Sequence, residues 1–220
     1  MVGRAKTSKN RPAAKLAARS PARRVQILSE TVVHDDFFRL SRTSLRYERF
    51  DGAMSGAVTR YVVERGDSAG ILLHNVETDE IILVEQFNYP AFTRSQGWMI
   101  QTLAGRVEAG EDASDAARRE ALEETGFRVD ELVKIGSFFV SPGGTSERVH
   151  LFYAPVRAKN QIAAGGGVMS EAEDIRNVVL SRRAFIRQAR YGQIDDAKTL
   201  IAALWLAKYR PSRKKPLPQI

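Results

Sequence analysis

The chain has 220 residues, a formal net charge of +8 and no cysteine. This length allows one catalytic domain with a small accessory sheet, but no second full-sized domain. The lack of cysteine excludes disulfides, thiolate zinc sites and a cysteine nucleophile, and it fits a reducing, cytoplasmic location. No apolar run approaches the roughly 20 residues needed to cross a bilayer, so we expect no membrane association.

The positive charge lies mainly at the N-terminal end. Residues 1–24 hold eight Lys or Arg residues and no acid, so the charges of residues 25–220 sum to zero. Because this segment has no aromatic residue, it cannot bury enough apolar surface to fold, and we expect a disordered basic tail. A nucleic-acid arm and an organelle transit peptide are the alternatives. Residues 210–220 form a second basic tail, and we expect no nucleic acid partner for either.

The first folded segment has the alternating pattern of β-strands. Phe37–Glu64 is rich in aromatic and β-branched residues and is broken at Asp51-Gly52, which predicts two or three antiparallel strands joined by a turn. We assign residues 25–65 to an N-terminal accessory sheet and residues 66–209 to the main domain.

The main domain is predicted to contain both strands and helices. Asp112–Thr125 is predicted as a helix, since Asp112 can cap it and Gly126 can take the left-handed conformation that ends it. The glycine-rich stretch Ala163–Gly167 predicts a mobile loop. The other predicted elements are strands at Ala69–His74, Ile81–Phe87, Trp98–Leu103, Val133–Val140, Val149–Ala154 (ended by Pro155) and Asn177–Leu180, and helices from Ser181 to about Tyr191 and from Asp195 to about Tyr209. Together they predict an α+β fold, with a mixed sheet and flanking helices.

The predicted helix from Asp112 carries a cluster of carboxylates. Glu120, Glu123 and Glu124 are three and four residues apart, which places them within an arc of about 100° on one helix face. Such a cluster destabilises a helix by about 0.2–0.5 kcal/mol per pair, so a cation is expected there. Oxygen ligands without His or Cys favour Mg²⁺ or Mn²⁺, which also bind substrate phosphates. Arg119 lies just outside the arc, where it can orient the glutamates. The alternative is an ordinary acidic surface helix.

The segment from Gly105 to Phe127 resembles the Nudix box. That motif fixes a glycine, a glutamate, an Arg-Glu pair, a Glu-Glu pair and a final glycine at set spacings. The matching residues are Gly105, Glu111, Arg119, Glu120, Glu123, Glu124 and Gly126, with Ala121 and Phe127 at the two apolar positions. At residue frequencies of ~5–10%, such a match arises by chance on the order of once in 10⁸ starts.

Other segments resemble the ADP-ribose pyrophosphatase branch of this family. They are FFRL at Phe37, DGAMS at Asp51, ERG at Glu64, SPGGTSER at Ser141–Arg148, EAEDI at Glu171 and GQIDDAKTLIAALWL from Gly192. The similarity covers about residues 35 to 208. It implies a Nudix fold and Mg²⁺-dependent hydrolysis of ADP-ribose to AMP and ribose 5-phosphate. Mn²⁺ is expected to substitute, and other nucleoside diphosphate sugars are further candidate substrates.

The resemblance also implies roles for single residues. Those implied as metal ligands are Ala104 (through its carbonyl), Glu120, Glu123, Glu124 and Glu173. Glu171 is implied as the general base, on a loop that moves in when substrate binds. Glu147 and Gly105 are implied as substrate contacts.

Substrate recognition is implied for three further residues. Phe37 would stack on the adenine and Arg60 would pair with phosphate or ribose, although a sheet-core aromatic and a surface charge are the alternatives. Asn88 stands where relatives usually carry an arginine that grips the substrate, and Gln101 stands where they usually carry glutamate. These departures concern the preference for ADP-ribose, not the hydrolase chemistry. The alternatives are a GDP-mannose or other nucleotide-sugar pyrophosphatase, and a non-catalytic nucleotide- or RNA-binding Nudix scaffold.

The accessory sheet also suggests an assembly. Phe37–Glu64 is too long and apolar to remain a free hairpin. In similar enzymes this sheet crosses to the partner subunit. The resemblance therefore implies a homodimer with an exchanged N-terminal sheet, in which Phe37 stacks on the base held by the other subunit.

Overall fold

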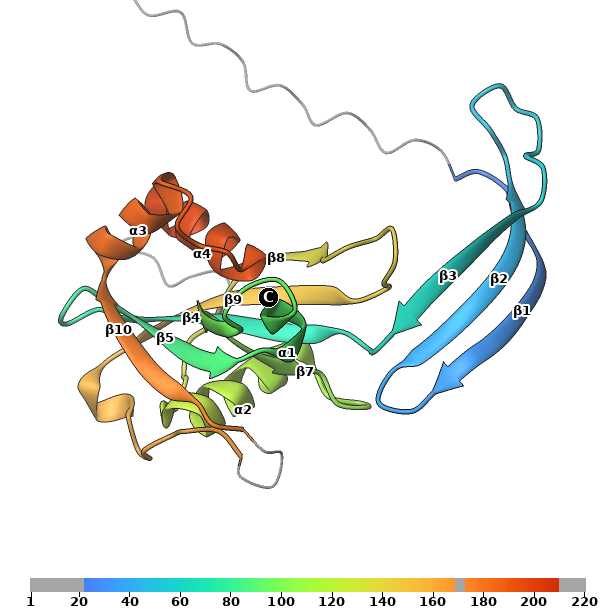
Figure 1. Cartoon of the computed structure of the whole chain (residues 1–220). Coiled ribbons are helices and arrows are strands. Elements are labelled where there is room, and N and C mark those ends of the chain that lie inside the picture. The colour runs from blue at the N-terminus through green and yellow to red at the C-terminus, as the bar shows by residue number, and fades with distance from the viewer. Residues whose placement is uncertain (1–21, 169–172, 210–220) are drawn as a thin grey trace, which may run out of the picture. The chain divides into compact units, whose positions relative to one another are not determined.

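The computed structural model describes residues 22–168 and 173–209 (Figure 1). The chain divides into two compact units. One comprises residues up to Glu30 together with Thr43–Arg60, and the other comprises Thr31–Arg42 together with residues from Tyr61 onward. Residues 1–21 and 210–220, which hold nearly all of the two predicted tails, lie outside the described residues. In the described part of the chain, no helix is long and apolar enough to cross a membrane.

The N-terminal segment forms a small antiparallel sheet. Its strands β1 (Val25–Asp35), β2 (Arg39–Tyr47) and β3 (Val58–Glu64) pair in the order β1-β2-β3. The predicted turn at Asp51-Gly52 is present in the β2–β3 connection, where Gly52 has φ 82°. The prediction of strands from Phe37 onward missed β1, whose sequence does not alternate strictly.

A larger, mixed sheet forms the centre of the main domain. Its strands are β4 (Ser68–Asn75), β5 (Glu80–Phe87), β6 (Trp98–Gln101), β7 (Leu103–Arg106), β8 (Val133–Phe139), β9 (Arg148–Val156) and β10 (Arg176–Ser181). The sheet order is β10-β5-β4-β9-β8, with β6 paired to β5 and β7 paired to β4. The pair β4 and β9 is parallel, and the other pairs are antiparallel.

Helices cover both faces of this sheet. They are α1 (Tyr89–Phe92), α2 (Ala113–Thr125), α3 (Arg182–Arg190) and α4 (Ala197–Lys208), with a short 3-10 helix at Ala158–Asn160. Along β4, Ile71 packs on the face that α2 covers, whereas Leu72 packs with α3 and α4 on the opposite face (Figure 1). Because both faces are buried, β4 reads as a continuous apolar run. The predicted α+β fold with a mixed sheet between helices is confirmed.

Two strand predictions were wrong in detail. Trp98–Leu103 is not one strand, because the chain changes partner at Thr102, whose N–H donates to the Thr199 hydroxyl at 2.7 Å. Pro155 does not end β9, which continues to Val156 beside β4. Pairing with β8 stops at Tyr153, so the proline lies where that side of the strand is unpaired. The four-residue helix α1 was not predicted.

The glycine-rich stretch was predicted as a mobile loop, but its described part is held against the end of α2. The N–H groups of Gly166 and Gly167 donate to the carbonyls of Glu124 and Glu123 at 2.9 and 3.2 Å. Gly165 has φ 72°, and a Cβ there would lie 2.6 Å from the Glu124 carbonyl oxygen. Position 165 therefore requires glycine, because a side chain there would collide with the end of α2. The next two residues, Gly166 and Gly167, satisfy carbonyls at that helix end.

Candidate active site

Helix α2 brings the predicted carboxylates together at the sheet. Asp112 caps the helix by accepting a hydrogen bond from the Ser114 N–H at 2.8 Å. Gly126 ends it in the left-handed conformation, with φ 75°. Between these ends, Glu120 and Glu124 turn inward and are 7% and 2% exposed. A surface helix does not bury two carboxylates in this way, so the alternative of a solvated acidic helix is wrong.

Strand β7 lies directly against one of these carboxylates. A Cβ on Gly105 would lie 1.8 Å from Glu120 Oε1, so no side chain can occupy this position while Glu120 keeps its place. The neighbouring residue, Ala104, pairs with Gly70 of β4. The spacing between Gly105 and the helix glutamates therefore has a steric cause, which is the close approach of strand backbone and helix side chain.

Arg119 joins the carboxylates into a network. Its guanidinium binds Glu111 through Nε and Nη2, each at 3.1 Å, and donates to the Arg106 carbonyl at 3.0 Å. Nη1 donates to Glu120 Oε1 at 2.8 Å and to Glu123 Oε2 at 3.1 Å. The hydrogen bond with Glu111 is the largest of the interactions that raise the pKa of Arg119, so the guanidinium is always charged. This geometry is that of an orienting residue between helix and strand.

Burial raises the pKa of both inner carboxylates. It raises the pKa of Glu124 to about 9, and the negative charges of Glu120 and Glu173 add to the effect. Burial also raises the pKa of Glu120 to about 7, although the charge of Arg119 opposes the shift. Glu124 Oε2 is buried without a hydrogen-bond partner among the described residues. A hard cation would satisfy this oxygen and offset the repulsion between the carboxylates.

The carboxylates of α2 are close together, but their present side-chain conformations do not form a metal-binding site. Within residues 22–168 and 173–209, no three acidic or histidine side chains surround one point in a way that could hold a metal ion. Glu120 and Glu123 instead share Arg119 Nη1. A cation could bind once these two carboxylates turned from Arg119 toward the unpartnered oxygen of Glu124. The residue types and their burial fit a divalent cation, and the rotamers would have to adjust.

A pocket of about 250 Å³ opens beside the carboxylates, on the side of Ala104 and Gly105. Of the predicted site residues, it is lined by Ala104, Gly105, Asn88 and Glu147, and Gln101 also lines it. The Ser68 hydroxyl donates to Glu147 Oε1 at 2.8 Å and so fixes that carboxylate at the pocket wall. We refer to this cavity as the substrate pocket.

Four predicted residues remain, Glu173, Glu171, Phe37 and Arg60, and none of the three that the structure describes lines this pocket. Glu173 accepts a hydrogen bond from the Val168 N–H at 3.0 Å and is near enough to raise the pKa of Glu120 and Glu124 by its charge. Glu171 lies outside the described residues. Phe37 is 77% exposed in the turn between β1 and β2, and Arg60 is an exposed residue of β3. The roles implied for these residues stay predictions.

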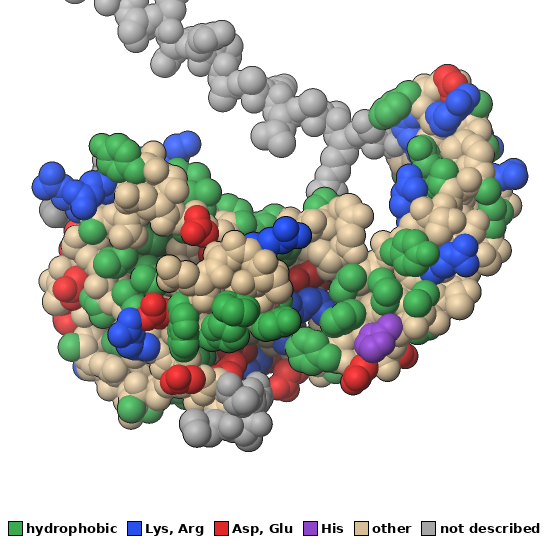
Figure 2. All heavy atoms as spheres, viewed as in Figure 1, with side chains coloured by type: hydrophobic (Ala, Val, Ile, Leu, Met, Phe, Trp, Pro, Cys, Tyr) green, Lys and Arg blue, Asp and Glu red, His purple; other side chains and the backbone are tan. Residues whose placement is uncertain are grey.

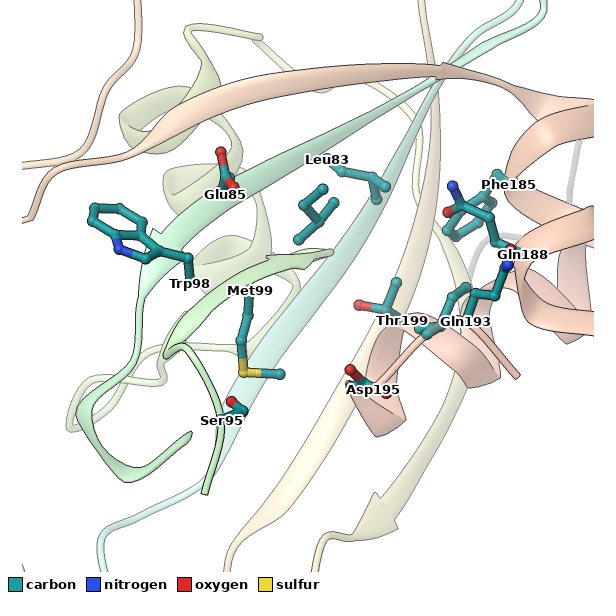
Figure 3. A pocket seen from close by; sticks show the side chains of 12 residues that line it. Leu83, Glu85, Ser95, Trp98, Met99, Phe185, Gln188, Gln193, Asp195 and Thr199 are labelled. Atoms are coloured by element: carbon teal, nitrogen blue, oxygen red, sulfur yellow. The ribbon is translucent and has the colours of Figure 1, made fainter. Parts of the chain in front are cut away.

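A second pocket, of about 280 Å³, contains none of the predicted residues (Figure 3). Glu85, Trp98 and Met99 lie on its strand side, and Gln188 and Gln193 come from the C-terminal helical region. Neither Ala104 nor Gly105, the strand residues beside the α2 carboxylates, lines it, so the pocket beside Gly105 remains the candidate for the substrate.

Sequence reasoning missed several polar residues of the substrate pocket. They are Arg65, Ser68, Gln86, Asp196 and Lys198. The first two precede β4 or open it, and the last two begin α4, which reaches the pocket only through the tertiary fold. No local pattern distinguishes them, although the segment from Gly192 was noted for its resemblance to the family.

The sheet between helices, with buried glutamates beside a strand glycine, is the architecture of a Nudix hydrolase. The NUDIX domain model matches residues 64–201. The chain belongs to this family.

Within the family, the chain is similar to enzymes that act on nucleotide sugars. It is 38% identical to an ADP-ribose pyrophosphatase of Escherichia coli over 86% of this chain and 91% of the relative. It is 35% identical to the enzyme of the same name from Haemophilus influenzae, over 83% and 85%. A GDP-mannose pyrophosphatase of Salmonella arizonae is 33% identical over 83% and 94%. The fold also matches a crystal structure of an ADP compounds hydrolase, with a TM-score of 0.62 at 20% identity, over 84% of this chain and 92% of that chain.

Proposed function

We propose that this protein hydrolyses the diphosphate bond of ADP-ribose to AMP and ribose 5-phosphate in a Mg²⁺-dependent reaction. The observation that carries the proposal is the pair of buried carboxylates, Glu120 and Glu124, beside a pocket large enough for part of a nucleotide. The similarity to ADP-ribose pyrophosphatases supports this substrate over other nucleoside diphosphate sugars. GDP-mannose is the second candidate, because a GDP-mannose pyrophosphatase is nearly as similar.

The metal would be held by the carboxylates of α2. We propose Glu120, Glu124 and the Ala104 carbonyl as ligands of Mg²⁺ or Mn²⁺, with Glu123 and Glu173 completing the set. When bound, such an ion polarises phosphoryl oxygens and makes a water molecule more acidic.

The other residues position the substrate and move the proton. Water adds to a phosphorus of the diphosphate, the bridging P–O bond breaks, and Glu171 takes the proton of the water as general base. Arg119 keeps Glu120 and Glu123 oriented through its link to Glu111. Glu147, fixed by Ser68, contacts the bound nucleotide sugar from the pocket wall.

A substrate panel tests this function. Purified protein with Mg²⁺ should convert ADP-ribose to equimolar AMP and ribose 5-phosphate, and excess EDTA should stop the reaction. Steady-state kcat/KM for ADP-ribose should exceed that for GDP-mannose and for UDP-glucose. A higher kcat/KM for GDP-mannose would select the second candidate. Full turnover in excess EDTA would refute the metal requirement.

We further propose that the protein is a homodimer. Strand β1 is at the edge of its sheet, and every one of its residues is exposed, including Val25 at 62% and Ile27 and Val33 at 55%. Figure 2 shows hydrophobic side chains along the surface of this sheet. An exposed apolar edge strand of this length needs a partner, and a second copy of the sheet supplies one. Each Phe37 would then stack on the base held by the other subunit.

Mixing two variants tests the shared site. Phe37→Ala and Glu124→Gln are each expected to be nearly inactive. After subunit exchange in an equal mixture, one site of each heterodimer collects both defects and the other collects neither, so about a quarter of all sites should recover. Recovery is measured as ADP-ribose turnover, and exchange is verified with differently tagged subunits. If exchange occurs without recovery, or if light scattering shows a monomer at assay concentration, each chain builds its own site.

A further inference from the structure

The first turn of α4 places a lysine where helix stability does not require one. Asp196 caps this helix by accepting a hydrogen bond from the Thr199 N–H at 2.9 Å, and Lys198 follows within the same turn. A cation near a helix N-terminus opposes the helix dipole, and the capping Asp196, not a residue of the first turn, is the acid of α4 that faces it. The position of Lys198 therefore calls for another explanation.

The ammonium group of Lys198 is held at the wall of the substrate pocket. It donates to Gln101 Oε1 at 3.1 Å and to Asp196 Oδ1 at 3.0 Å, and the side chain is 17% exposed. Gln101 is itself 5% exposed, which makes this a fixed contact and not a surface pair. An ammonium has three N–H donors, and these two acceptors use two of them. One donor is left for a ligand in the pocket.

Lys198 is the less exposed of the two cations that line the pocket. The other is Arg65, which is 46% exposed and lies 3.8 Å from Glu147. Asp196 meets Lys198 with one oxygen, and its other oxygen accepts hydrogen bonds from the N–H and the hydroxyl of Thr199. Gln101 accepts a hydrogen bond without a negative charge, so it holds the ammonium in place and leaves its charge for a ligand.

The same ammonium is close to the reacting end of the pocket. Its partner Gln101 ends β6, and Ala104 and Gly105 of the next strand, β7, line the same pocket. A Cβ on Gly105 would lie 1.8 Å from Glu120 Oε1, so this part of the pocket adjoins the glutamates of α2. A diphosphate placed in the pocket beside Gly105 would therefore share this cavity with the Lys198 ammonium.

We propose that Lys198 is a substrate-binding residue that donates to a phosphate oxygen of the substrate diphosphate, and that Gln101 positions it for this contact. The proposal rests on the proposed hydrolysis of a nucleoside diphosphate sugar. Asn88, which also lines the pocket, is uncharged, and its amide donates to the Gln86 carbonyl at 3.3 Å. Of the two cations that line the pocket, we assign the diphosphate to Lys198 of α4, because Arg65 is 46% exposed and Lys198 only 17%.

The test compares Lys198→Met with Lys198→Arg and with Lys208→Met, a matched change at the exposed end of the same helix. KM and kcat are measured with ADP-ribose and Mg²⁺, and AMP and adenosine binding are measured by calorimetry. Lys198→Met should raise KM and the Kd for AMP about 10- to 100-fold, the effect of losing one charge-assisted hydrogen bond. The Kd for adenosine and kcat should stay within about 3-fold. Lys198→Arg should recover most of the affinity, and Lys208→Met should match the wild type.

The AMP and adenosine titrations keep this proposal separate from the proposed function. If the wild type does not hydrolyse ADP-ribose, the function fails, but a selective loss of AMP affinity in Lys198→Met still supports the phosphate contact. Should Lys198→Met lower the unfolding temperature and leave KM and AMP affinity unchanged, the lysine is only a structural partner of Asp196, and the proposal is wrong. Equal weakening of AMP and adenosine would also overturn it, because the contact would then be to the nucleoside.

Discussion

Replacing Glu124 by glutamine is expected to lower the turnover of ADP-ribose by at least ~10³-fold. The change removes the charge of the most deeply buried carboxylate of α2, whose Oε2 is free of hydrogen bonds in the described structure. It keeps the size of the side chain, so packing against β7 should survive. The measurement is kcat with saturating Mg²⁺. Asp115→Asn, at the exposed start of the same helix, is the control and should stay within about 3-fold of the wild type.

The same variant should be more stable than the wild type when metal is absent. Burial raises the pKa of Glu124 from its ordinary value of 4.5 to about 9, so the folded wild type holds a proton that the unfolded chain releases. The stability of the wild type is then lost as pH rises through this window, from about 4.5 to about 9. Glutamine has no proton to lose and escapes this loss.

Thermal unfolding in EDTA at pH 5 and pH 8 measures the difference. The gap in unfolding temperature between Glu124→Gln and the wild type should widen toward pH 8. Adding Mg²⁺ should raise the unfolding temperature of the wild type more than that of the variant, because the ion binds the ionised carboxylate. A variant that is less stable than the wild type at pH 8 without metal would mean that Glu124 serves the fold, and the loss of turnover would have a structural cause.

The sequence predicted the part of the site that is local. Glu120, Glu123 and Glu124 lie on one helix, so their spacing alone places them on one face, and the cap at Asp112 and the end at Gly126 follow from residue type. The central strands β4 and β5 were predicted from their apolar runs, which are buried on both faces.

The parts that were missed depend on contacts between distant residues. Lys198 contacts Gln101 only because α4 packs beside the junction of β6 and β7. The break between these strands at Thr102 depends on the same packing, since the Thr102 N–H donates to Thr199 of α4. The glycines of Ala163–Gly167 suggested a mobile loop. In the structure they allow the backbone to lie close against the end of α2, a contact that no local sequence pattern predicts. Contacts between residues far apart in the sequence therefore determine the features that the local residue pattern does not predict.

Gly105→Ala is expected to lower turnover by about 10²- to 10³-fold with little loss of stability. The new Cβ would meet Glu120 Oε1 at 1.8 Å and its carboxyl carbon at 2.0 Å. Since these atoms are the end of a flexible side chain, the fold can survive by moving Glu120 away from β7. That movement takes a proposed metal ligand out of place and breaks its hydrogen bond with Arg119 at 2.8 Å.

Two measurements separate a displaced carboxylate from a damaged fold. The unfolding temperature of Gly105→Ala in EDTA should stay within about 4 °C of the wild type, whereas the stabilisation by Mg²⁺ should be strongly reduced. Gly136→Ala is the matched control, because Gly136 also lies in a strand of the sheet and its Cβ would meet nothing within 4 Å. This control should keep wild-type turnover. If Gly105→Ala retains both full turnover and the response to Mg²⁺, the contact between β7 and Glu120 does not position the metal site, and another residue must explain the glycine.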